Sequence, residues 1–83
     1  MTQRLPEQKL KETMAKIFEV DVSEISEDAS PDTISTWDSL RHMNLVIGLE
    51  QVFGIEFSDE EVVEILSYKL IRLVLREHGI EFD

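Results

Sequence analysis

The feature that most constrains the fold of this chain is the apolar stretch at residues 40–53. On a helical wheel with a step of about 100° per residue, its apolar side chains cover nearly the whole circumference. The narrow polar gap consists of Arg41, Asn44, Gly48 and Gln51. Such a helix is either central in a bundle or presents apolar groups to a partner. Gly54 favours a helix end directly after Phe53, so the pattern predicts one helix over residues 40–53.

Two more segments combine helical spacing with terminal signals. Pro6 suits a first helical turn, and the apolar spacing that follows predicts a first helix over residues 6–19. Ser67 suits the N-cap of a last helix, and Gly79 suits its end. The apolar positions of that last helix are Leu70, Ile71, Val74 and Leu75.

A capping box marks the start of a short third helix. Ser58 is followed three residues later by Glu61, and this pairing predicts a helix over residues 59–66. The acids in its first turn are favoured by the helix dipole. We expect this helix to bury some combination of Val62, Val63, Ile65 and Leu66.

Residues 20–37 form a long connection between the first two helices. They mix acids, serines and a proline with scattered apolar residues, which indicates an ordered loop held over a core. No segment predicts a strand, because residues 80–83 are too short and have no evident partner. The sequence therefore predicts an all-α fold: a four-helix bundle with a short third helix and a long loop between helices 1 and 2, as a single domain over residues 1–83.

The composition limits the kinds of site that the chain can hold. Among 83 residues there is no cysteine, which removes disulfides, thiolate metal ligands and cysteine nucleophiles together. A formal net charge of −10 disfavours nucleic acids and anionic membranes as partners. No apolar run approaches membrane-spanning length, and residues 1–10 lack the apolar segment of a signal peptide. We therefore expect a cytoplasmic monomer that does not insert into membranes.

A catalytic interpretation of Asp38, Ser39 and His42 is disfavoured by their spacing. A serine triad needs an acid that orients the histidine from its far side, whereas Asp38 and Ser39 are chain neighbours and His42 lies about one helical turn further on. Metal binding is disfavoured as well, because the two histidines, His42 and His78, lie on different predicted helices. The acids after Ser58 also lack the alternating spacing of a calcium loop. We expect neither an enzyme nor a metal site.

Ser39 occupies the start of the apolar helix, where two roles are open to it. Asp38 or Ser39 could serve as the N-cap, since both residue types are favoured there. The position would equally suit a phosphate ester on the serine oxygen, because outward-pointing amides and the helix dipole favour negative charge. The residues alone leave capping and attachment as alternatives.

Taken together, the stretch TWDSLRHMNLVIGLEQVFGIEFSDEEV resembles the acyl carrier proteins. Their pattern places Asp-Ser-Leu at the start of the second helix, which ends in Leu-Glu-x-x-Phe. An isoleucine-containing link and an acidic start of the third helix follow. The order of elements matches over residues 5–79, and the matching residues are Asp38-Ser39-Leu40, Leu49-Glu50-Gln51-Val52-Phe53, Ile55 and Asp59-Glu60-Glu61.

The resemblance implies a role for each residue at the start of the second helix. Ser39 would carry a 4′-phosphopantetheine arm, attached by a phosphopantetheinyl transferase, and the terminal thiol of the arm would hold an acyl group as a thioester. Asp38 and Leu40 would be recognised by that transferase. The protein itself would catalyse nothing, and it would serve acyl-activating, condensing or acyl-transfer enzymes.

The resemblance also implies that partners dock on the outer face of the second helix. Members of the family that act in fatty acid biosynthesis carry several acids there, whereas this face is nearly neutral, which favours a specialised lipid or polyketide-type pathway. An aminoacyl carrier of the D-alanyl type and an unmodified helical adaptor are the alternatives. Trp37 and His42 are candidates for contact with the arm or the acyl group, although a half-buried, hydrogen-bonded role would also explain His42. The predicted docking residues are Leu40, Arg41, Asn44, Ile47, Glu50 and Gln51.

Overall fold

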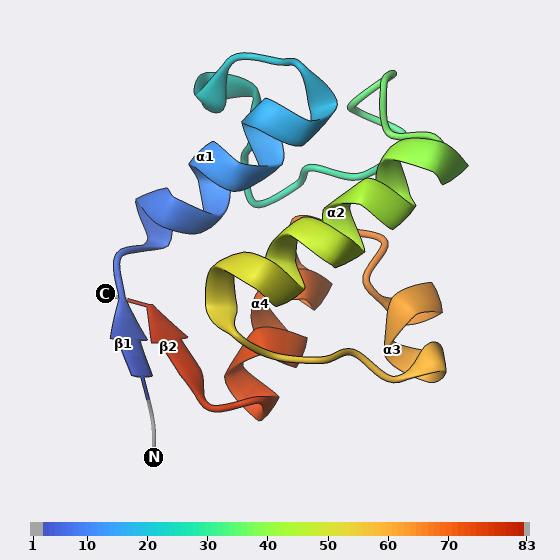
Figure 1. Cartoon of the computed structure of the whole chain (residues 1–83). Helices are drawn as coiled ribbons and strands as arrows, with labels where there is room; N and C mark the ends of the chain where they lie inside the picture. The colour runs from blue at the N-terminus through green and yellow to red at the C-terminus, as the bar shows by residue number, and fades with distance from the viewer. Residues whose placement is uncertain (1–2, 83) are drawn as a thin grey trace.

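The computed structural model describes residues 3–82, with side chains from residue 5 onward. It confirms the predicted all-α bundle of four helices, with a short third helix and a long loop after the first (Figure 1). In Figure 1, α2 crosses in front of α4, while α3 lies to one side and the strands β1 and β2 lie at the other. The elements are β1 (Gln3–Leu5), α1 (Glu7–Phe18), a 3₁₀ turn at Val22–Glu24, α2 (Ser39–Phe53), α3 (Asp59–Glu64), α4 (Tyr68–Glu77) and β2 (Ile80–Phe82).

The long loop between α1 and α2 is ordered over the core, as its scattered apolar residues predict. Hydrogen bonds tie it to α1 and α4: the Thr36 hydroxyl donates to the Phe18 carbonyl at 2.7 Å, and the Ala29 carbonyl accepts from the Tyr68 amide at 2.9 Å. The buried apolar residues of the loop are Ile25, Ala29, Ile34 and Trp37. Burying these side chains offsets part of the entropy that is lost when a long loop is ordered.

Gly48 allows α1 and α2 to pack closely. A Cβ atom at this position would lie 2.8 Å from Cδ1 of Ile17 on α1, nearer than carbon atoms normally approach. Glycine costs about 1 kcal/mol of helix propensity relative to alanine. The close contact between the two helices explains why the glycine is tolerated in the middle of α2.

The predicted end of the third helix was wrong by two residues. The helix ends at Glu64, and Ile65 leaves helical geometry with φ −79° and ψ 59°. This turn buries the Ile65 side chain completely but leaves Val63 and Leu66 exposed. Burial of one large residue therefore outweighs continuation of the helix. Leu70, expected among the apolar positions of α4, is likewise 41% exposed.

The expectation that the chain has no strands was also wrong. β1 and β2 form a two-stranded parallel sheet in which Gln3 pairs with Ile80 and Leu5 with Phe82. Ile80 is buried, and the Phe82 ring packs edge-on against Phe53 at a centroid distance of 5.8 Å. The pairing depends on segments at opposite ends of the sequence, and local patterning does not reveal such a partner.

Candidate functional site

Asp38, rather than Ser39, caps α2. Its carboxylate accepts the Arg41 backbone N–H at 2.8 Å, so one of the free amides of the first turn is satisfied. Ser39 is consequently the first helical residue, and its side chain is exposed. Within residues 3–82 the Ser39 hydroxyl has no hydrogen-bond partner. The alternative between capping and a free hydroxyl is therefore resolved in favour of the free hydroxyl.

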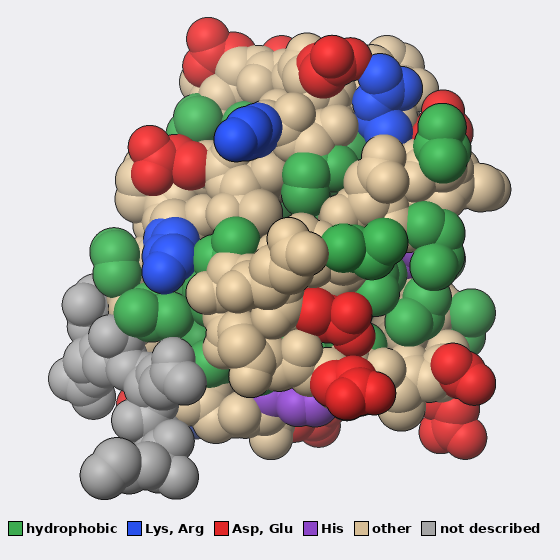
Figure 2. Space-filling model, viewed as in Figure 1, with side chains coloured by type: hydrophobic (Ala, Val, Ile, Leu, Met, Phe, Trp, Pro, Cys, Tyr) green, Lys and Arg blue, Asp and Glu red, His purple; other side chains and the backbone are tan. Residues whose placement is uncertain are grey.

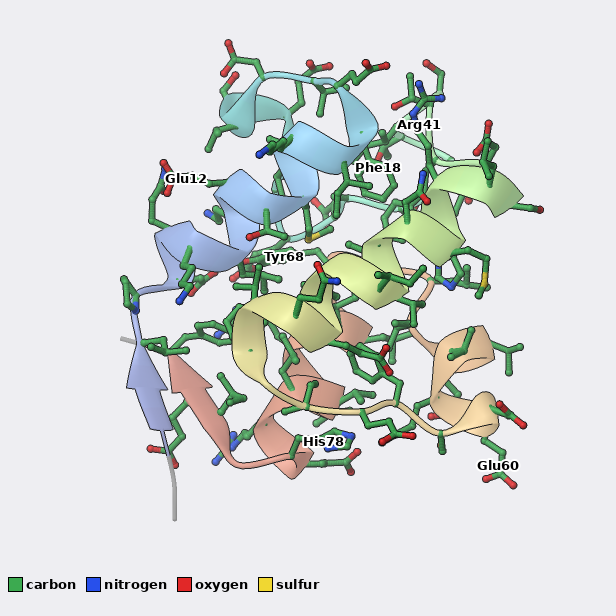
Figure 3. All side chains as sticks on the ribbon, in the orientation of Figure 1. Glu12, Phe18, Arg41, Glu60, Tyr68 and His78 are labelled. Carbon is green, nitrogen blue, oxygen red and sulfur yellow. The ribbon has the colours of Figure 1, made fainter. Side chains whose placement is uncertain are left out.

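Arg41 links the start of α2 to the end of α1. Its guanidinium lies 2.6 Å from a carboxylate oxygen of Glu19 and 3.9 Å from one of Asp38. Figure 3 shows Arg41 near Phe18, where the end of α1 approaches the start of α2. Glu19 adopts the left-handed conformation, with φ 56°, as it ends α1. The sequence did not predict this ion pair, because its partners are far apart in the chain. The ion pair uses part of the Arg41 charge near the start of α2.

His42 is half-buried and bonded on both ring nitrogens. The Trp37 indole N–H donates to Nδ1 at 3.1 Å, and Nε2 lies 2.7 Å from the Val62 carbonyl. Because an indole nitrogen can only donate, Nδ1 must be an acceptor, and Nε2 then carries the proton and donates to Val62. The residue thus ties the start of α2 to α3. This agrees with the hydrogen-bonded role weighed from the sequence.

A pocket of about 260 Å³ adjoins Ser39. It brings together four residues that the sequence analysis had singled out, and Pro31 and Leu66, which it had not. Pro31 belongs to the loop and Leu66 to the turn after α3, so no local signal could place them beside Ser39. Trp37 stacks on Phe18 of the core with ring centroids 4.7 Å apart. The lining residues are Pro31, Trp37, Asp38, Ser39, His42 and Leu66.

An exposed apolar patch flanks the pocket on α2 and the α3 region. Figure 2 shows hydrophobic side chains gathered there, with acidic side chains close by. We refer to these five residues as the apolar patch; they and their exposed fractions are Leu40 (71%), Met43 (48%), Ile47 (51%), Val63 (68%) and Leu66 (47%). Patches of this kind on small proteins commonly mark interaction sites.

The other predicted docking residues differ in how free they are. Asn44 and Gln51 are exposed on α2. The Glu50 carboxylate, in contrast, accepts the Phe57 backbone N–H at 2.8 Å. Glu50 therefore holds the link between α2 and α3, a role that its position in the sequence did not reveal.

A second histidine holds α3 from its other side. His78 Nε2 lies 3.0 and 3.1 Å from the two carboxylate oxygens of Glu61. The pKa of Glu61 is held below its usual value by two contacts. The larger effect comes from the Ser58 backbone N–H, which donates to the Glu61 carboxylate at 2.9 Å, and His78 adds to it. α3 contains no fully buried residue, so these polar contacts are important for its position.

Residues 3–82, the part of the chain that the structure describes, lack two kinds of feature. No cluster of three or more histidine, aspartate or glutamate side chains is arranged to hold a metal ion in this part of the chain. No helix in the same range is long and apolar enough to cross a membrane.

The molecule is a small helical bundle that presents an exposed serine hydroxyl between a pocket and an apolar patch. Comparison with known proteins identifies the class to which this arrangement belongs. The chain is 36% identical over 62 residues to an acyl carrier protein of Coprothermobacter proteolyticus, covering 75% of this chain and 76% of that protein. It is 29% identical over 66 residues to polyketide-8 synthase acyl carrier protein 2 of Streptomyces avermitilis, covering 80% and 76%. No protein-family model matches.

The chain belongs to the acyl carrier proteins. It is accordingly a carrier protein and not an enzyme.

Proposed function

We propose that this carrier holds acyl groups on a 4′-phosphopantetheine arm attached through a phosphodiester to Ser39. The observation that carries the proposal is the free, exposed hydroxyl at the first position of α2. When attached, the arm supplies a terminal thiol that bonds an acyl group as a thioester, which a cysteine-free chain cannot provide from its own residues. The remaining chemistry concerns how the chain positions this attachment point.

The start of α2 fits a phosphodiester. Amides in the first turn of a helix have no intrahelical acceptor, and the dipole of a 15-residue helix favours negative charge at this end. The carboxylate of Asp38 would oppose a second negative charge beside it. Arg41, 3.9 Å from that carboxylate, offsets part of this repulsion. Asp38 is exposed as well, so a transferase can reach it together with Leu40.

The pocket beside Ser39 is lined by the ring-bearing residues Trp37 and His42, by Pro31 and Leu66, and by the polar Asp38 and Ser39. Both nitrogens of His42 and the indole N–H of Trp37 are already used in hydrogen bonds. Leu66 adds an apolar wall. We propose that Trp37 and His42 contact the arm or acyl group through their ring surfaces and not through polar atoms.

The apolar patch, with Arg41, Asn44 and Gln51, is the surface that we propose for docking of partner enzymes. These partners would be the transferase and acyl-activating, condensing or acyl-transfer enzymes. Arg41 is paired with Glu19, so docking would depend on apolar contact more than on charge. The neutral face and the relative that is named for a polyketide synthase both support a specialised lipid or polyketide-type pathway.

Intact mass spectrometry tests the attachment. We would co-express the chain with a broad-specificity phosphopantetheinyl transferase and map any added mass to a peptide. We expect one phosphopantetheine increment on Ser39, absent in Ser39→Ala and present in the matched control Ser58→Ala. If the wild-type chain stays unmodified while another carrier is loaded in the same cells, an unmodified adaptor becomes the better explanation.

The cargo is tested on the loaded protein. Purified acyl-activating and D-alanine-activating ligases would be offered to it in parallel, and the added mass would be measured. We expect an acyl increment. An increment only from the aminoacyl ligase would instead assign the chain to the aminoacyl carriers.

A further inference from the structure

A second hollow, of about 400 Å³, lies between α4 and β2. Three cations line it at positions i, i+3 and i+7 of α4, so they lie along one side of the helix. Apolar side chains from α4 and β2 line the rest. We call this hollow the basic groove; its residues are Lys69, Arg72, Leu73, Arg76, Ile80, Glu81 and Phe82.

The three cations of the groove differ in their ion pairing. Arg72 is shared between Glu7 and Glu27, at 3.7 and 3.6 Å. Among the side chains of residues 5–82, Lys69 and Arg76 have no ion-pair partner, and both are exposed. Glu81 also lines the groove and is engaged in an interaction of its own. Lys9, Lys11 and Lys16 on α1 have no ion-pair partner among the described residues either. What distinguishes Lys69 and Arg76 is that they line one hollow together with the exposed Leu73.

We propose that the basic groove binds an acidic segment of a partner protein that also carries an apolar side chain. Carboxylates would pair with Lys69 and Arg76, and the apolar side chain would rest on exposed Leu73. This surface is distinct from the apolar patch, and its use does not depend on an arm at Ser39.

The net charge of the molecule limits which kinds of partner can bind in the basic groove. At −10, the chain as a whole repels phosphate-rich polymers and anionic membranes, and two unpaired cations do not reverse that field. Two copies of the chain, each at −10, repel one another in the same way. A short acidic segment brings few charges, so it can use the local cations without meeting the full repulsion.

The geometry of α4 also predicts the spacing of the acids. Lys69 and Arg76 are seven residues apart, which is about 10 Å along a helix. An extended peptide covers this distance in about three residues. Because side chains of an extended peptide alternate between its two faces, acids on one face lie an even number of positions apart. We therefore expect acids four positions apart, with an apolar residue midway between them.

The groove and the Ser39 pocket have no lining residue in common. Figure 1 shows β2 at the lower left and the start of α2 at the upper right. A partner held in the groove would leave Ser39 accessible to other enzymes. Such a second contact raises the effective concentration of the carrier near its partner.

Selection from a random-peptide library displayed on phage tests this proposal, with the unmodified full chain as bait. Wild type, Lys69→Glu/Arg76→Glu and the matched control Lys9→Glu/Lys16→Glu would be compared; the control makes the same charge change on exposed α1 positions. If circular dichroism shows that Lys69→Glu/Arg76→Glu has lost helix, the neutral variant Lys69→Gln/Arg76→Gln replaces it. A selected peptide would then be titrated by NMR at low salt and at about 0.5 M salt.

We expect wild type and control to select peptides with paired acids around an apolar residue. The chosen peptide should shift the amides of Lys69, Leu73 and Arg76 and bind the groove variant about tenfold more weakly or worse. Equal weakening in both charge variants, peptides without acids, or shifts confined to the apolar patch would each overturn the proposal. Competition by inorganic phosphate at the same concentration as the peptide would also overturn it. So would sedimentation that shows self-association through Lys69 and Arg76.

Discussion

The helices α2 and α4 both begin with a polar cap followed by a residue that bears a hydroxyl group. In α2 these are Asp38 and Ser39, and in α4 they are Ser67 and Tyr68. The Ser39 hydroxyl is exposed and has no hydrogen bond within residues 3–82, whereas Tyr68 is fully buried and its hydroxyl donates to Glu7. The same backbone position thus presents a group to solvent in one helix and locks it into the core in the other.

The difference comes from the direction in which each first turn faces. α4 turns its first residue toward α1, where burial, followed by the hydrogen bond to Glu7, raises the pKa of Tyr68 well above its usual range. α2 turns its first residue outward, and a neighbouring carboxylate does the capping. The outward direction of this turn exposes the Ser39 hydroxyl, and capping by Asp38 leaves that hydroxyl free of a structural hydrogen bond.

Removing the cap of α2 should have the largest effect. In Asp38→Ala, Ser39 becomes the best available N-cap, so its hydroxyl turns inward to accept a backbone amide. We expect the initial rate of phosphopantetheine loading, followed by intact mass, to fall by about tenfold or more, equivalent to about 1.4 kcal/mol. Asp38→Asn keeps a capping oxygen and should lose less; its remaining deficit measures the carboxylate charge. If Asp38→Ala were loaded at the same initial rate as wild type, this explanation would be contradicted.

The buried hydroxyl of α4 predicts an alkaline limit to stability. The pKa of Tyr68 is raised in the folded chain, so this contribution is intact below about pH 10, the unfolded value, and is lost above it. The free energy of unfolding should fall by about 1.4 kcal/mol per pH unit above pH 10.

Denaturant melts at several pH values would measure this slope, and Tyr68→Phe should flatten it. The chain has one tyrosine, so tyrosinate absorbance reports on Tyr68 alone. A tyrosinate signal near pH 10 in the folded protein would show that the hydroxyl is not protected.

Serine-to-alanine changes should separate free from capping hydroxyls. The Ser58 and Ser67 hydroxyls accept the Glu61 and Leu70 amides, each at 3.1 Å. Each substitution there should cost about 1 kcal/mol in urea melts and leave loading unchanged. Ser39→Ala should lose loading but little stability, since alanine is a good helix former. A stability loss in Ser39→Ala equal to that of Ser58→Ala would erase the distinction.

The smallest effect should appear at the start of α3 in acid. The pKa of Glu61 is lowered, mainly by the Ser58 amide and then by His78. Its contribution is therefore present above the unfolded pKa of about 4.3 and is lost as pH falls through the lower folded value. Glu61→Gln should be less stable than wild type at pH 7 and equal to it near pH 3. A difference that persists at pH 3 would mean that the side chain acts through packing and not through its charge.

The sequence predicted the features that depend on local signals. Gly54 ends α2 in the left-handed conformation, and the Ser58–Glu61 capping box forms with both of its reciprocal bonds. Ser67 caps α4. Each signal lies within a few residues of the structure that it sets, so chain neighbours alone decide the outcome.

The features that the sequence missed depend on contacts across the fold. Asp38 and Ser39 are equally good caps, and only the observed hydrogen bond separates them. The end of α3 was displaced by burial of Ile65, and Leu66 reached the Ser39 pocket through the same turn. The pairing of β1 with β2 joins residues from both ends of the described chain. Periodicity contains no information about such distant partners.

The parallel order of β1 and β2 also decides how the fold bears tension. The described chain enters at the start of β1 and leaves at the end of β2, and the two strands run in the same direction. A force that pulls these two ends apart slides one strand along the other, so the hydrogen bonds between them are loaded together and not one after another. An antiparallel pair at the same place would unzip bond by bond. Although the two strands are short, their parallel pairing means that a force on these ends must shear the strands apart before the bundle can extend.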